Sequence, residues 1–463
     1  MKTRTLIIIF LLFPMALCAR ETYSTTFRDT IHSEILGEDR PISVHVPASA
    51  FTSKQKYPVL FILDGDYNFT YVKGLLDVQA TIGERIPEMI LVGISGKGSE
   101  TYRRNCKPDI PGVEDSGNAD QFADFIEKEL FPFIHQRYPA AGYNILAGHS
   151  IGGLCVVNTA LNRPNLFQHY IAISPALWWE QNAINQVAEA KAGRTFEGEL
   201  YVSLADEEGM GVQRFLKVAT GRFAANGYVI SGILLFAVLM AFFLFFGVKK
   251  RLLAVVVLLT GLGLAGWLHW AYTPSSHRIH FKQFPLENHN TVGLPTYLWA
   301  LQDIFHSWNV RGDYFESAEA LENYFEQVYL KYGKTFNLPH TKLYYTGWFL
   351  QDNPDEIANF SAVLKEKFPA SAAEFDVIWA NRLLKKGQAE EATALLKQLL
   401  QSSPNHADAY KSLAGIYLDE GKPALAGSMI TTAIELAEAQ KQRNWQLNEL
   451  YEVREKVQKM PAE

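Results

Sequence analysis

The chain carries at residues 143–154 the stretch YNILAGHSIGGL, in which Gly148-His149-Ser150-Ile151-Gly152 has the pattern G-x-S-x-G. The apolar run Tyr143–Ala147 is typical of a strand, and apolar residues recur at helical spacing from Leu154 onward. Glycines at both ends of the pattern permit a tight strand–turn–helix connection that holds a serine hydroxyl exposed. This context favours Ser150 as a nucleophile over the alternative, a glycine-rich helix N-terminus without chemistry.

Strands and helices alternate on both sides of this stretch. The segment Gln121–Tyr138 has the 3.6-residue period of a helix, and short apolar runs predict strands. The predicted strands are Pro41–Val46, Pro58–Leu63, Glu88–Ile94, Tyr170–Ser174, Leu200–Ala205 and Arg278–Phe284. This alternation indicates an α/β fold class with a mostly parallel sheet covered by helices on both faces.

A serine nucleophile needs a base, and in this kind of fold the acid and the histidine follow the serine in that order. His289 lies in a loop between the predicted strand Arg278–Phe284 and a predicted helix, Leu294–Phe305. By contrast, His149 stands next to Ser150 within the turn, where its ring cannot easily reach round to accept the serine proton. The sequence therefore predicts His289 as the base.

Three acidic residues, Asp206, Glu207 and Glu208, follow the predicted strand Leu200–Ala205 directly. One of them is expected to orient the imidazole and stabilise its positive charge. We predict Glu207, with Asp206 as the runner-up, while a solvated acidic turn is the alternative for any one of them.

Two backbone N–H groups are needed to stabilise an oxyanion. The first is expected from Ile151, the residue after the nucleophile, and the second from Gly65 or Asp66, in the loop after the strand Pro58–Leu63. An ordinary turn is the alternative interpretation of this loop.

The overall composition excludes several classes of protein. With 43 basic against 49 acidic residues and a net charge of −6, no basic stripe predicts nucleic acid as a partner. Three cysteines exclude a disulfide-rich scaffold and show no paired metal-ligand spacing. At about 150 residues per domain, 463 residues leave room for about three domains.

The N-terminus has the order of a secretory signal peptide, expected at residues 1–19. Lys2 and Arg4 precede the apolar run Leu6–Leu17, and small residues follow it. Cleavage after Cys18 or Ala19 fits this order. The alternative is that the segment is not cleaved and serves as a membrane anchor.

Two uncharged runs, Tyr228–Gly247 and Leu252–Tyr272, flank the turn Lys249-Lys250-Arg251. Each is long enough to cross a hydrocarbon core of about 30 Å as a helix. The basic turn is expected on the cytoplasmic side. We therefore predict a transmembrane hairpin at 228–272, inserted into the α/β part, and a location in the inner membrane of a bacterium with the other domains on the periplasmic side. A buried core hairpin is the alternative.

The region 311–463 is expected to be all-helical and shows an internal period of 34 residues, the length of a tetratricopeptide repeat. The recurring residues are Ala380, Gly387, Ala392, Leu396 and Leu400, and then Ala414, Gly421, Ala426, Ile430 and Ile434. We predict such repeats at about 372–439, which bind a protein partner or pack on the α/β part as a cap. A generic helical bundle is the alternative.

Several motifs resemble, as a set, the esterases related to enterochelin esterase within the α/β-hydrolases. They run in family order from about Thr30 to Trp308. They are Tyr57-Pro58-Val59-Leu60-Phe61-Ile62-Leu63-Asp64-Gly65, Leu91-Val92-Gly93-Ile94, Arg104-Asn105 with Pro108-Asp109, Gly148-His149-Ser150, Ile173-Ser174-Pro175 and Glu287-Asn288-His289.

This resemblance implies an α/β-hydrolase fold at 20–227 and 273–310, ester hydrolysis, and no metal or organic cofactor. The chain departs from the family in a loosened arginine segment, Arg103–Pro108, and in the insertion between acid and histidine. We therefore expect a membrane-tethered serine esterase with the triad Ser150–His289–Glu207, acting on a small-molecule or glycan ester. The alternative is a non-catalytic hydrolase fold that presents the repeats to a protein partner.

Overall fold

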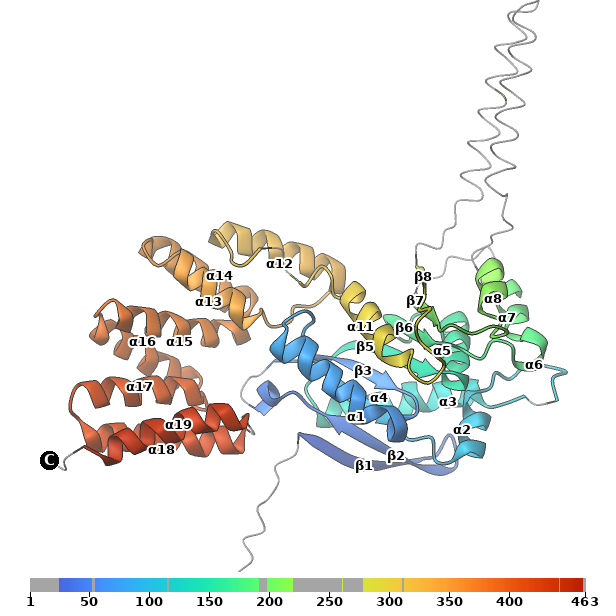
Figure 1. Ribbon diagram of the computed structural model, residues 1–463, viewed down its shortest axis with the longest axis horizontal. Helices are drawn as coiled ribbons and strands as arrows, with labels where there is room; N and C mark the ends of the chain where they lie inside the picture. Colours follow the sequence, from blue (N-terminus) through green and yellow to red (C-terminus); the bar gives the residue numbers. More distant parts are fainter. Residues whose placement is uncertain are drawn as a thin grey trace, which may run out of the picture.

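The computed structural model describes residues 25–51, 55–114, 116–190, 198–219, 278–309, 312–440 and 442–460, together with Thr260. A mixed sheet with covering helices forms one part of the described chain, and an arm of paired helices extends from it (Figure 1).

Within the described ranges the sheet has eight strands, in the order β1-β2-β4-β3-β5-β6-β7-β8. In the described part of the chain, β2 pairs in the antiparallel sense with both β1 and β4, and the other strand pairs are parallel. The strands are β1 Thr26–Ser33, β2 Glu38–His45, β3 Tyr57–Ile62, β4 Ile90–Ile94, β5 Ala140–His149, β6 His169–Ile173, β7 Glu199–Leu204 and β8 Ile279–Gln283. Since β3 to β8 run parallel, the residues that follow them meet at one edge of the sheet.

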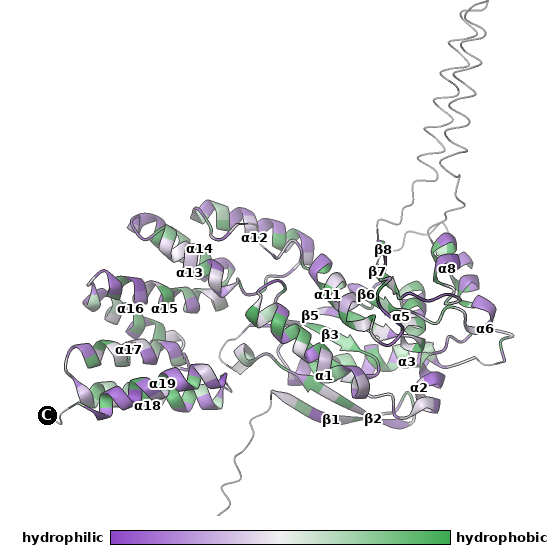
Figure 2. Cartoon of the chain, in the orientation of Figure 1, coloured by the Kyte–Doolittle hydropathy of each residue, from purple (hydrophilic) through white to green (hydrophobic). Residues whose placement is uncertain are grey.

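Alternate residues of the central strands enter two different cores. In β3, Val59 and Phe61 pack under α3, α4 and α5, whereas Leu60 and Ile62 pack under α1 and α11. Because both faces are covered, the strand is apolar throughout, and Figure 2 shows the central strands in hydrophobic colours. The helices of this part are η1 Ala48–Phe51, α1 Gly65–Leu76, η2 Asp77–Ile82, α2 Ser99–Cys106, α3 Ala119–Phe125, η3 Ile126–Leu130, α4 Phe131–Arg137, α5 Ile151–Asn162, α6 Trp179–Asn182, α7 Ile184–Ala190, α8 Val212–Ala219 and α11 Gly293–Ile304.

Helix pairs with the predicted 34-residue period form the C-terminal arm. Gly387 and Gly421 occupy equivalent turns with φ of 77° and 70°, which glycine adopts without strain. Ala380 and Ala414 are fully buried between crossing helices, as the repeat pattern requires. The helices are α12 Ala318–Tyr332, α13 His340–Phe349, α14 Pro354–Lys367, α15 Pro369–Lys385, α16 Ala389–Ser402, α17 Ala407–Asp419, α18 Pro423–Ala439 and α19 Asn444–Gln458.

The first helices of this arm share a hydrophobic core with the sheet. Residues of α12 to α15 belong to the same buried cluster as Leu60 and Tyr201. The Tyr332 hydroxyl donates a hydrogen bond of 3.0 Å to the Ile304 carbonyl, and its ring lies 5.8 Å from that of Tyr143. The start of the arm is therefore packed on the α/β part.

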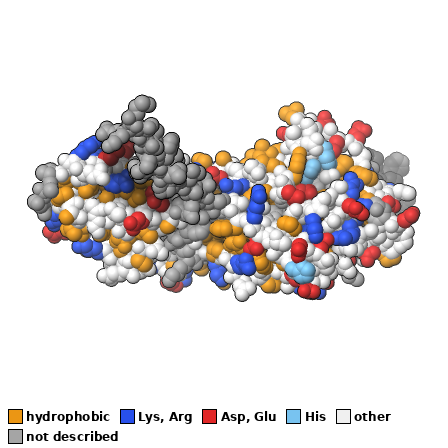
Figure 3. Space-filling model, turned by 90° about the horizontal axis from the view of Figure 1, so that it is seen from below, with side chains coloured by type: hydrophobic (Ala, Val, Ile, Leu, Met, Phe, Trp, Pro, Cys, Tyr) orange, Lys and Arg blue, Asp and Glu red, His pale blue; other side chains and the backbone are white. Residues whose placement is uncertain are grey.

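On the face shown in Figure 3, acidic and basic side chains are interspersed, and no continuous stripe of one sign crosses its coloured part.

The structure corrects the predicted fold class in one respect. No helix in the described ranges is both long and apolar enough to cross a membrane. The longest of them, α15 and α18, have 17 residues each and carry charged side chains, whereas a span needs about 20 mostly apolar residues. This finding contradicts the prediction of an inserted transmembrane hairpin. It also contradicts the predicted location in the inner membrane, which rested on that hairpin. The run 228–272 apart from Thr260, and the predicted signal peptide at 1–19, lie outside the described residues.

Candidate active site

Ser150 occupies a sharp turn between β5, which ends at His149, and α5, which begins at Ile151. Its backbone has φ 57° and ψ −115°, a conformation that costs a residue with a side chain about 1–3 kcal/mol. The turn depends on small neighbours, because a Cβ on Gly148 would lie 2.5 Å from the Gly152 carbonyl oxygen. The strain lifts the serine side chain above the carboxyl edge of the sheet.

Glu207 and His289 meet at this same edge. Glu207 follows β7 and His289 follows the neighbouring strand β8, and the carboxylate oxygens lie 2.9 and 3.2 Å from His289 Nδ1. Both side chains are partly shielded, at 18% and 33% exposure. The runner-up acid, Asp206, is exposed, and its backbone N–H donates to the Glu287 carbonyl at 2.9 Å. Of the two, Glu207 is the residue beside the imidazole.

A serine to which the sequence assigned no role holds the Glu207 carboxylate in place. The Ser174 hydroxyl donates to Glu207 Oε1 at 2.5 Å and accepts from the Ala205 N–H at 3.0 Å. Ser174 directly follows β6, so its position at the carboxyl edge of the sheet was the signal that could have identified it. Its hydrogen bond fixes Oε1, while Oε2 makes the shorter contact, 2.9 Å, with His289 Nδ1.

His149 lies beside His289 in the folded chain. Their ring centroids are 4.5 Å apart and tilted by 42°. Burial, and after it the positive charge that His289 can carry, lower the pKa of His149 to about 4. His149 is therefore neutral near pH 7, and its ring packs against His289. Within the described chain the Ser150 hydroxyl forms no hydrogen bond, and contacts of this kind commonly tighten only with substrate bound.

The predicted oxyanion donors come from adjacent strands. The Leu63 N–H, at the end of β3, donates to the Ala147 carbonyl of β5 at 2.9 Å, so both strands leave the sheet side by side. Gly65 and Asp66 form the first turn of α1 and Ile151 begins α5, where helix N–H groups have no acceptor within their own helix. The Asp66 side chain is turned toward the next loop, where it accepts from the Gly96 N–H at 2.9 Å.

Tyr102 of α2 links the loop before α1 to the serine turn through a partly buried hydrogen bond and a packing contact. The Tyr102 hydroxyl donates to Asp64 Oδ2 at 2.5 Å and also lies against the Gly152 backbone. The pKa of the Asp64 carboxyl is raised to about 6, chiefly by burial and in part by the nearby Asp66 charge, against the hydrogen bond from Tyr102, which lowers it. Tyr102 thus fixes the relative position of the two segments that carry the predicted oxyanion donors.

We expect Asp64→Asn to change the pH dependence of stability. The pKa of Asp64 in the folded chain, about 6, lies above its ordinary value of 3.8, so the folded state loses stability as the pH rises from about 4 to 6. Asparagine does not titrate and its oxygen still accepts from Tyr102. The variant should therefore gain up to about 3 kcal/mol relative to the parent between pH 4 and pH 7, measured from urea unfolding at both values. A stability difference that stays constant with pH would refute this assignment.

The loosened arginine segment lies largely in α2 and is tied to β2. Arg104 Nη2 and Asn105 Nδ2 donate to the Glu38 carboxylate at 2.9 and 3.1 Å, and Arg40 Nη1 donates to it at 3.2 Å. Arg104 is thus engaged in an internal ion pair.

In the part of the chain that the structure describes, no group of three or more His, Cys, Asp or Glu side chains is arranged to hold a metal ion.

Comparison with known proteins agrees with this architecture. A family model described as "Putative esterase" matches residues 33–205, and one described as "Tetratricopeptide repeat" matches residues 383–444. The siderophore triacetylfusarinine C esterase of Aspergillus fumigatus is 32% identical over 150 residues, which cover 30% of this chain and 51% of that protein. The ferri-bacillibactin esterase BesA of Bacillus subtilis is 29% identical over 143 residues, covering 27% and 50%.

The matched region therefore spans about half the length of these curated relatives. Among solved structures, an IroE-like serine hydrolase from Shewanella oneidensis superposes with a TM-score of 0.53 at 20% identity, covering 74% of this chain and 99% of the other. That likeness concerns the fold alone. Residues 33–205 of the chain thus match an esterase family and residues 383–444 match tetratricopeptide repeats.

Proposed function

We propose that the protein is a serine esterase that hydrolyses carboxylic esters through an acyl-enzyme, with Ser150 as nucleophile, His289 as general base and Glu207 as the orienting acid. The observation that carries the proposal is the contact of 2.9 Å between Glu207 Oε2 and His289 Nδ1, at the same end of the parallel strands as a serine in a strained turn. A carboxylate at Nδ1 fixes the tautomer in which Nε2 is free to accept a proton.

The reaction then proceeds in two halves. Ser150 Oγ attacks the ester carbonyl carbon while His289 Nε2 takes its proton, and the N–H groups of Ile151 and of Gly65 or Asp66 stabilise the oxyanion. His289 next gives that proton to the departing alcohol, leaving an acyl group on Ser150. Water, deprotonated by His289, attacks the acyl carbon and releases the acid, and the serine recovers its proton.

In this proposal His289 acts as the catalytic base, whereas His149 only packs against it. We expect His289→Ala to lower kcat by about 10⁴-fold or more, because it removes the base. His149→Ala should retain substantial turnover, within about tenfold of the parent, since a neutral ring with a pKa of about 4 supports the base without accepting the proton. The measurement is kcat on a p-nitrophenyl ester, and equal losses in both variants would contradict the assignment of roles.

The substrate class is tested with an ester panel. We propose a small-molecule or glycan ester. Ferric triacetylfusarinine C and ferri-bacillibactin belong in the panel, because the curated relatives are named as esterases of these siderophores. Short p-nitrophenyl esters and matched amides complete the set. The proposal requires ester hydrolysis that Ser150→Ala abolishes, whereas no turnover of any ester would favour the alternative of a non-catalytic scaffold.

A further inference from the structure

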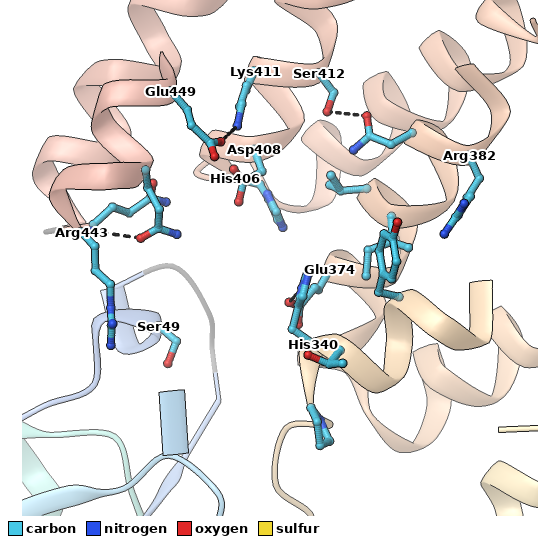
Figure 4. A pocket seen from close by; sticks show the side chains of 18 of the residues that line it. Ser49, His340, Glu374, Arg382, His406, Asp408, Lys411, Ser412, Arg443 and Glu449 are labelled. Carbon is cyan, nitrogen blue, oxygen red and sulfur yellow. Dashed lines mark hydrogen bonds and ion pairs between the residues drawn. The ribbon is translucent and has the colours of Figure 1, made fainter. Parts of the chain in front are cut away.

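A cavity of about 1460 Å³ lies between the α/β part and the inner side of the helical arm, here called the interdomain cavity. One wall comes from the loops before β3 and β4, and the other from α13, α15, α17 and the start of α19. Figure 4 shows labelled side chains from both walls around this space, among them Ser49 on one side and His340, Asp408 and Lys411 on the other.

The interdomain cavity is separate from the candidate active site. Its lining residue Glu88 stands just before β4, at the amino ends of the parallel strands, whereas Ser150 follows the carboxyl end of β5. The sheet therefore lies between them. At about 1460 Å³ the interdomain cavity also exceeds the roughly 300–1,000 Å³ of ordinary small-molecule pockets, so its size suits a length of extended polypeptide.

Two contacts hold the walls together. Arg443 Nη2 forms an ion pair of 2.5 Å with Asp77, at the junction of α1 and η2. The Thr341 N–H, in the first turn of α13, donates to both carboxylate oxygens of Glu84 at 3.2 Å. These two polar contacts add to the core that α12 to α15 share with the sheet, so the space between the walls has defined sides.

The charges in the interdomain cavity favour a cationic occupant. Seven Asp and Glu residues line it against four Lys and Arg residues. Two of the four cations are paired, Lys411 with Glu449 and Arg443 with Asp77. Three of the seven carboxylates are also paired, Glu449 with Lys411, Glu420 with Lys422 and Glu374 with His340, which leaves four carboxylates against two cations. Among the described residues, Asp408 and Asp419 form no ion pair with a lysine or arginine, although Asp408 interacts with the nearby His406 and His340. An occupant with positive side chains would satisfy this surplus of carboxylates, whereas an acidic one would be repelled.

Exposed aromatic rings in the lining point to the same kind of occupant. Tyr344 is 38% exposed and Trp445 58% exposed at the interdomain cavity. The Arg382 guanidinium lies 4.7 Å from the centre of the Tyr344 ring, which shows how a cation is accommodated there. Trp445 offers a second face for a lysine or arginine side chain.

We propose that the interdomain cavity binds an extended, positively charged peptide segment, held by the α/β part and the repeats together. The site is composite, because carboxylates of both walls face the occupant. This inference does not depend on esterase activity, so Ser150→Ala should leave peptide binding unchanged.

Fluorescence anisotropy of the full chain tests the proposal with three fluorescein-labelled peptides of about ten residues, alternating Lys–Ser, Glu–Ser and Gly–Ser. The Lys–Ser peptide should bind at least tenfold more tightly than the other two at 0.15 M salt, where long-range surface attraction is screened. Equal binding of all three peptides, or no binding of any, would overturn the proposal.

Substitutions locate the binding. Gly415→Trp should abolish it, because Gly415 lines the interdomain cavity and nothing lies within 4 Å of a Cβ built there, so a large side chain can leave the helix at this position and occupy the cavity. Gly74→Trp on α1 is the matched control, since its Cβ position is equally open but lies outside the lining, and it should bind normally. Unchanged binding by Gly415→Trp would contradict the location.

Charge substitutions test the composite character. Asp408→Asn with Asp419→Asn should weaken binding of the Lys–Ser peptide at least tenfold, and Glu84→Gln on the opposite wall should weaken it severalfold. The control, Glu319→Gln with Glu322→Gln, removes two charges from α12, outside the lining, and should have no effect. Equal losses in the control would show non-specific attraction, and an unaffected Glu84→Gln would show that the repeats bind alone.

Discussion

Ser150→Ala should abolish ester hydrolysis, with a fall in kcat of about 10⁴-fold or more. The side chain removed is the attacking atom, and the remaining donors and base cannot supply a nucleophile held in the same place. The fold should survive, because alanine is smaller and the serine hydroxyl makes no hydrogen bond within the described chain.

The measurement is initial rate on p-nitrophenyl butyrate, with circular dichroism to establish that the variant is folded. Ser412→Ala is the control, since that serine lines the interdomain cavity on the other side of the sheet and should keep full activity. Full activity in Ser150→Ala would remove the enzymatic assignment altogether.

Glu207→Gln should lower kcat by about 10²- to 10⁴-fold, as the loss of other triad acids does. The amide is nearly the same size, so packing is preserved, but it cannot stabilise the imidazolium and can turn an N–H toward His289 Nδ1. Ser174 would still donate to the remaining oxygen, which keeps the side chain in position.

Asp206→Asn is the matched control for this change. It removes the same charge one residue away, on a side chain that is exposed and has no contact with His289. Turnover should stay within about twofold of the parent. A crippled Asp206→Asn with a mild Glu207→Gln would reverse the choice of acid.

The sheet could be predicted well because its central strands are buried on both faces. Continuous apolar runs such as Tyr57–Ile62 have no other stable environment in an α/β fold, and the family resemblance and the repeats were confirmed by comparison with known proteins. By contrast, β1 was not predicted. It is a half-exposed edge strand in which Arg28 and Asp29 interrupt the apolar pattern.

Part of the candidate site could be predicted because chain order and strand ends are readable in sequence. The structure brings Glu207 beside His289, while the catalytic roles of Ser150, His289 and Glu207 stay predictions. The support from Ser174 and the link from Tyr102 to Asp64 could not be foreseen. Both are contacts between residues far apart in sequence, and only the pairing of strands brings them together.

The transmembrane hairpin was predicted from hydropathy and length alone, without support from any tertiary contact. That criterion finds no helix in the described ranges that could span a membrane. The repeat pattern also could not predict how α12 to α15 pack on the sheet. A period of 34 residues describes only the contacts between neighbouring helices.

The most direct test of the central claim is mass spectrometry of the protein after reaction with a fluorophosphonate. Attack by a serine hydroxyl that His289 deprotonates displaces fluoride and leaves one phosphonyl group on the oxygen. We predict a single adduct, mapped to Ser150, with none in Ser150→Ala and strongly slowed labelling in His289→Ala. An adduct on another residue, or no adduct on the folded parent protein, would contradict the account.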